Sequence, residues 1–151
     1  MVLAQAVDNP AHLKLRDLAR RFFEWKGFSV RESVPVEGDH EDYEFDFLIS
    51  NKEKATLGDR TPVGVLMKDW ARVCGVNVII RCETIMNDVR NVVPQGLVVS
   101  NQFSVAAREL AQKANILLLS RGELVSIFHI EPEILRNCYN SVVAAESPKG
   151  G

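Results

Sequence analysis

The sequence predicts an α/β fold: a central mixed sheet of five strands with helices on both of its faces. The first observation is the helical spacing of apolar residues near the N-terminus, over residues 11–26. The second is a run of three strand-like segments with no helix between them, which predicts an antiparallel meander. The third is a pair of short apolar strands, each reached through a helix, which predicts parallel crossovers. The predicted order is therefore αβββαβαβ.

The first predicted helix, residues 11–26, has one apolar and one basic side. Pro10 suits its first turn and Gly27 ends it. Its apolar stripe consists of Leu15, Leu18, Phe22 and Trp25. Its more polar side carries Lys14, Arg16, Arg20, Arg21 and Lys26. This basic side is either a surface for phosphate groups or an ordinary solvated face.

Three strands with alternating polarity follow, joined by polar connections. They are predicted over residues 28–36, 43–50 and 62–69. The acidic residues 37–42 form the first turn, and the charged residues 51–61 form the second connection.

Helices and strands alternate in the second half of the chain. Helical spacing predicts a helix over residues 77–93, which Pro94 ends. Ser104 is a suitable N-cap for the next helix, residues 105–114. The other predicted elements are buried strands at 96–100 and 115–120, an edge strand at 124–128 and a last helix at 132–145.

The 151 residues suffice for one domain with a core, expected over residues 1–146 with a flexible tail at 147–151. The net charge of -2 means that binding to an anionic partner must rest on a local basic patch. Three scattered cysteines indicate buried thiols rather than disulfides, and the three histidines lack metal-ligand spacing. With no apolar run of membrane-spanning length and no basic region typical of a signal peptide, a cytoplasmic protein is expected.

Two charged residues lie within apolar strands, where an unpaired charge is costly. Asp46 lies in the segment EFDFLI (44–49), and Lys68 lies in VGVLMKDW (63–70). The two could form an ordinary ion pair across adjacent strands, or they could belong to a site. Trp70 is expected to be a packing residue.

Four segments carry a resemblance to a known family. These are EWKGFSV (24–30), VLMKDW (65–70), GLVVSNQFSVAA (96–107) and NILLLSRGEL (115–124). In this order, together with Asp46 on the second strand, they resemble the PD-(D/E)xK nuclease superfamily. Within it the chain is most similar to Mrr-type restriction endonucleases and archaeal Holliday-junction resolvases. The resemblance implies a restriction-endonuclease-like fold and metal-dependent hydrolysis of phosphodiester bonds in DNA.

The resemblance also implies a site. Asp46 would bind Mg²⁺ or Mn²⁺, with Glu44 as a second metal ligand, and Lys68 would stabilise charge or orient water. Active relatives place an acid or glutamine two residues before the lysine, whereas this chain has Leu66. Glu83, on the following helix, could replace that acid. Further candidate ligands are Glu24 and Glu32. DNA contacts are expected from Arg16, Arg20, Arg21, Lys26 and Lys68.

Leu66 leaves more than one function open. The chain could be an endonuclease of DNA repair, recombination or restriction. It could also be a catalytically inactive relative that binds DNA, or that binds a protein partner in transcription or DNA processing. A homodimer is a further expectation, because the last helix (132–145) offers an apolar face.

Overall fold

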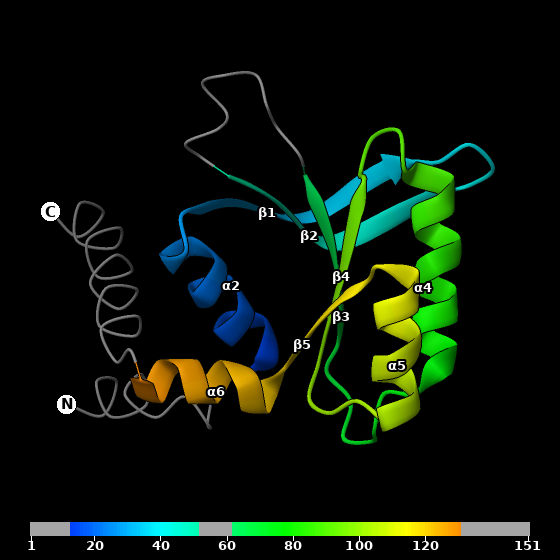
Figure 1. The fold of residues 1–151 in the computed structure, drawn as a ribbon. Helices are drawn as coiled ribbons and strands as arrows, with labels where there is room; N and C mark the ends of the chain where they lie inside the picture. The colour runs from blue at the N-terminus through cyan, green and yellow to red at the C-terminus, as the bar shows by residue number, and fades with distance from the viewer. Residues whose placement is uncertain (1–12, 52–61, 131–151) are drawn as a thin grey trace, which may run out of the picture.

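The computed structural model describes residues 13–51 and 62–130 of the chain. Its centre is one five-stranded sheet with the spatial order β1-β2-β3-β4-β5 (Figure 1). The strands are β1 (Phe28–Glu37), β2 (Asp42–Asn51), β3 (Val63–Lys68), β4 (Gln95–Ser100) and β5 (Leu117–Ser120). The helices are α2 (Leu15–Trp25), α4 (Val76–Val89), α5 (Val105–Ala114) and α6 (Arg121–Ile130).

The strand pairing confirms the predicted mixed sheet. β2 pairs with β1 and with β3 in antiparallel fashion, as expected for a meander. β4 lies parallel to β3 and to β5, and each of these parallel connections passes through a helix. The strands lie in the sheet in the order of the sequence. The pairing changes from antiparallel to parallel at β3.

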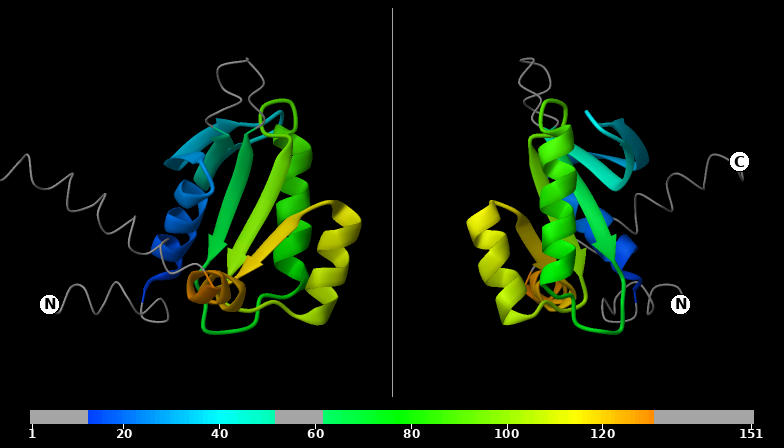
Figure 2. Two further views of the ribbon diagram at one scale, coloured as in Figure 1. Left: turned by 60° about the vertical axis from the view of Figure 1, so that its left-hand side comes forward. Right: turned by 90° about the vertical axis from the view of Figure 1, so that its right-hand side faces the viewer.

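Two hydrophobic cores cover the two faces of the sheet, and Figure 2 shows the helices that enclose them. Helices α2 and α6 enclose the first, named here the α2/α6 core. Its buried residues are Leu15, Leu18, Ala19, Phe23, Phe47, Ile49, Val65, Leu97, Val99, Leu124 and Phe128. Helices α4 and α5 enclose the second, the α4/α5 core, whose members include Phe45, Leu66, Ile79, Val98 and Phe103.

The predicted edge strand at residues 124–128 is wrong: this segment lies in helix α6. Ser120 and Glu123 form a reciprocal cap at its start. The backbone N–H of Glu123 donates to the Ser120 hydroxyl, and the backbone N–H of Ser120 donates to the Glu123 carboxylate, both at 3.2 Å. This is the capping-box arrangement, which satisfies N–H groups that the first turn of a helix leaves free. Leu124 and Phe128, one turn apart, are then both buried.

Smaller differences concern the ends of helices. Helix α2 begins at Leu15 rather than at residue 11, because Lys14 is extended. Helix α4 ends at Val89, and the backbone N–H of Val93 still donates to Val89 at 2.8 Å, which keeps Val93 buried. The predicted last helix, the tail and Cys138 lie outside the described residues. Within the part that is described, Cys74 and Cys82 are buried free thiols, and no helix has the length and apolar character needed to cross a membrane.

Candidate functional site

A cleft opens where strands β2 and β3 separate. The two strands pair only from Phe47 to Ile49 on β2 and from Val63 to Val65 on β3. Beyond these pairs they diverge, and a cleft of about 910 Å³ lies between them and helix α4. Its lining includes Glu44 and Asp46 from β2, Lys68 from β3, Trp70 and Arg72 from the following loop, and Arg81 from α4. The structure therefore brings three predicted catalytic residues, Glu44, Asp46 and Lys68, to one cleft.

A local twist of the β1–β2 hairpin places Asp46 at the point of divergence. Ser33 has a left-handed backbone with φ of 52°. The ladder pairs Glu32 with Phe47 and Val34 with Phe45, but it skips Ser33 and Asp46 between them. Phe45 packs in the α4/α5 core, whereas Phe47 packs in the α2/α6 core. Residues two apart thus face opposite layers here, contrary to regular strand alternation.

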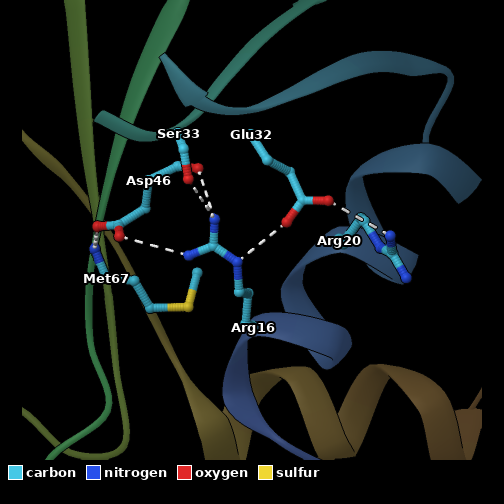
Figure 3. Close-up of polar contacts among 6 residues, drawn as sticks. All are labelled: Arg16, Arg20, Glu32, Ser33, Asp46 and Met67. Carbon is cyan, nitrogen blue, oxygen red and sulfur yellow. Dashed lines mark hydrogen bonds and ion pairs between the residues drawn. The ribbon is translucent and has the colours of Figure 1, made fainter. Parts of the chain in front are cut away.

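Both carboxylate oxygens of Asp46 accept hydrogen bonds from the protein itself (Figure 3). The backbone N–H of Met67 donates to Oδ2 at 2.7 Å. The guanidinium of Arg16 donates to Oδ1 at 3.4 Å through Nη1 and to the Asp46 carbonyl at 3.1 Å through Nη2. Asp46 therefore joins the separated end of β3 to β2 and to helix α2.

Arg16 connects helix α2 to the twisted part of the hairpin. Besides Asp46 it donates to Glu32 at 3.0 Å and to the Ser33 hydroxyl at 3.4 Å, and it lies 4.8 Å from the centre of the Phe47 ring. Arg20 also forms an ion pair with Glu32, at 3.4 Å. Two of the predicted DNA-contacting cations are thus engaged with carboxylates of the hairpin, as Figure 3 shows.

In the arrangement that the structure describes, the side chains around Asp46 do not form a complete set of ligands for Mg²⁺ or Mn²⁺. Mg²⁺ needs several hard oxygen ligands in octahedral geometry. The described residues contain no group of three or more acidic, histidine or cysteine side chains that could hold a metal. Leu66 is 9% exposed and packs in the α4/α5 core, so its position supplies an apolar side chain where an oxygen ligand is needed.

The other residues that the sequence suggests as metal ligands or DNA contacts do not line this cleft. Glu83 is exposed on α4 and lines a second depression of about 700 Å³ with Asn87 and Arg90 instead. Glu24 and Lys26 are exposed at the end of α2, where Lys26 lies over the Trp25 ring. Arg21 is half-buried. The structure therefore does not bring Glu83 to Asp46.

Sequence reasoning missed Asp88, which fixes the turn between β1 and β2 to helix α4. Its buried carboxylate accepts hydrogen bonds from the Tyr43 hydroxyl at 2.9 Å, from the His40 backbone at 2.9 Å and from His40 Nδ1 at 2.6 Å. Burial raises the pKa of Asp88, but hydrogen bonds from His40 and Tyr43 outweigh it and lower the pKa to about 2. The same contact raises the pKa of His40. Local sequence gives no signal for this pair, because the partners are 48 residues apart.

Comparisons with known proteins agree with this architecture. The crystal structure of a protein of unknown function, AF1548, superposes with a TM-score of 0.58 at 19% identity, covering 73% of this chain and 62% of that protein. A repair endonuclease from Pyrococcus abyssi superposes with a TM-score of 0.51 at 14% identity, covering 68% of this chain and 42% of that protein. The chain thus spans less than two thirds of either structure. Comparison with curated proteins gives no match.

A family model links the sequence to the same fold. The model Mrr_cat, described as Restriction endonuclease, matches residues 7–128, which include α2, the complete sheet and most of α6. The match covers well over half of the chain. This chain therefore belongs to the Mrr-type restriction endonuclease family of the PD-(D/E)xK nucleases.

Proposed function

We propose that this domain binds DNA at the cleft between β2 and β3, and that Asp46 serves the structure of the cleft rather than metal-dependent hydrolysis. Family membership supports DNA as the ligand. The observation that carries the proposal is that Arg16 and the Met67 N–H donate hydrogen bonds to the two oxygens of the Asp46 carboxylate. Leu66 beside it offers no replacement ligand.

The cleft has a basic side and an acidic side. Lys68 and Arg72 form no ion pair with any described residue, so both are available to phosphate groups. Arg81, by contrast, is paired with Glu41 at 3.2 Å. The opposite wall carries Glu44, which repels phosphate. We therefore expect phosphates at Lys68 and Arg72 rather than at Arg16 and Arg20 of helix α2, which are paired with carboxylates.

A second candidate function is metal-dependent cleavage of DNA. It is favoured by one observation, the shared lining of the cleft by Glu44, Asp46 and Lys68. In this case a phosphate of bound DNA would compete for Arg16, and Glu44 and Asp46 would bind Mg²⁺ or Mn²⁺ while Lys68 stabilised developing charge.

Calorimetry and cleavage assays on the wild type and Asp46→Asn separate the two candidates. DNA binding without Mn²⁺ binding, and without cleavage of duplex or branched DNA in Mg²⁺ or Mn²⁺, supports the first. Mn²⁺ binding and nicking that Asp46→Asn abolishes would establish the second.

Salt dependence tests the placement of the phosphates. The affinity for DNA falls with salt in proportion to the number of phosphate contacts. Arg72→Ala removes one proposed contact and is expected to reduce the salt slope by about one unit. Lys26→Ala, a change at an exposed cation away from the cleft, is the matched control and leaves the slope unchanged. Equal slopes for Arg72→Ala and wild type would overturn the placement.

A further inference from the structure

Trp70 lies at the cleft without belonging to a hydrophobic core. It is a member of neither the α2/α6 core nor the α4/α5 core, although it lines the cleft and is half-buried. Among the described residues, two cations lie over its ring. Lys68 Nζ lies 5.5 Å from the ring centre, and the Arg72 guanidinium lies 4.2 Å from it. Neither core of the described residues therefore accounts for a large aromatic residue at this position.

The backbone that presents Trp70 is held in place on both sides. The side-chain amide of Asn101 donates to the Trp70 carbonyl and to Asp69, each at 2.8 Å. Arg121 in turn donates to the Asn101 oxygen at 2.6 Å. Four residues after Trp70, Cys74 pairs with Phe103 through an isolated parallel bridge. A backbone held in this way loses little conformational freedom when a ligand stacks on the ring that it carries.

We propose that Trp70, with Lys68 and Arg72, binds one unpaired nucleotide of DNA. The base stacks on the indole ring, and the adjoining phosphate contacts Lys68 and Arg72. An aromatic platform beside cations that have no acidic partner is the combination with which proteins hold single-stranded nucleic acid. A volume of about 910 Å³ is within the range of pockets that enclose a small ligand, and the acidic wall formed by Glu44 keeps the phosphate on the Trp70 side.

This proposal rests on the proposed DNA binding and specifies its substrate class. The domain should prefer DNA with an unpaired base, such as a mismatch, a flap or a single strand, to fully paired duplex. Stacking of one base on an aromatic side chain corresponds to roughly 5- to 150-fold in affinity. Trp70→Leu should lose this factor for single-stranded DNA and much less for duplex.

The experiment uses the full chain with Trp25→Phe, so that Trp70 is the one remaining tryptophan. Trp25 packs at the edge of the α2/α6 core, away from the cleft, and its replacement is a matched aromatic exchange. Fluorescence of Trp70 is followed during titration with oligothymidylate, with duplex of equal length and with a strand of abasic sites. Labelled DNA reports binding independently through anisotropy.

Binding of oligothymidylate with quenching of Trp70, and binding of the abasic strand without quenching, is the expected result. Binding of DNA without any quenching would overturn the nucleotide site and leave the proposed DNA binding intact. No binding to any DNA would overturn both. Trp70→Phe keeps a stacking ring and should retain most of the affinity, which separates loss of stacking from loss of folding in Trp70→Leu.

Discussion

Replacement of Asp46 by asparagine tests whether this acid stabilises the fold or is retained as a metal ligand. Oδ2 accepts the Met67 N–H at 2.7 Å, and a hydrogen bond to a charged acceptor contributes about 1.5–3 kcal/mol to the free energy of unfolding. The ion pair with Arg16 spans 3.4 Å between side chains that are each 37% exposed, so solvent screening limits it to about 0–1 kcal/mol.

Asparagine keeps one carbonyl oxygen and can satisfy one of the two donors. The expected loss for Asp46→Asn is therefore about 1–3 kcal/mol in the free energy of unfolding. For a domain of this size each kcal/mol lowers Tm by about 2–4 °C. Urea unfolding followed by circular dichroism measures the free energy, and a thermal scan gives Tm.

The sign of the change in the free energy of unfolding shows whether Asp46 has a structural role. Acids kept for function are commonly held in unfavourable surroundings, and removing them stabilises the fold. Glu44→Gln is the matched control, because Glu44 is exposed, lines the same cleft and has a side chain that forms no hydrogen bond or ion pair with the described residues. Its effect should stay within about 0.5 kcal/mol. An Asp46→Asn variant as stable as the wild type, or more so, would refute a structural role for Asp46.

Two further predictions concern residues outside the lining of the cleft. Gly64→Ala places a Cβ atom 2.5 Å from the Phe45 ring, and overpacking of this kind should lower the free energy of unfolding by about 1–3 kcal/mol in urea titrations. The stability that Asp88 contributes should be complete above its ordinary pKa of 3.8 and lost as pH falls towards about 2, because its pKa is lower in the folded state. The raised pKa of His40 acts in the opposite direction: its contribution is present below 6.5 and is lost as pH rises through the raised value. Unfolding of wild type and Asp88→Asn from pH 2 to pH 9 checks both, and a stability difference that does not change with pH would contradict them.

The order of the elements could be predicted because the spacing of apolar residues and the positions of proline and glycine indicate the same element boundaries along most of the chain. Ser104 shows the local rules at their best, since its hydroxyl accepts the Ala107 N–H at 3.1 Å as an N-cap should. The segment at 124–128 shows where they conflict. Its β-branched and aromatic residues favour a strand, but Ser120 and Glu123 carry the capping-box spacing that marks the start of a helix. The capping-box spacing is present in the sequence, and in the structure it outweighs the residue propensity.

The site could be predicted only in part. Asp46, Glu44 and Lys68 do meet at one cleft, as strand order implies. The partners of Asp46 could not be predicted, because the engagement of Arg16 depends on the left-handed backbone of Ser33 within an apparently regular alternating segment. The isolation of Trp70 from both cores depends in the same way on where the loop after β3 runs, which local periodicity does not determine.

The twist at Ser33 also has a consequence for solubility. β1 is an edge strand of ten residues, and a long, flat edge is a template on which another chain can add a strand and begin aggregation. The twist divides this edge into two shorter lengths that lie against different cores. Pro35, which follows Ser33, removes one backbone N–H donor, and the charged residues Arg31 and Glu32 precede Ser33. The conformation that brings Asp46 to the cleft thereby also makes β1 a poorer template for the addition of a strand from another chain.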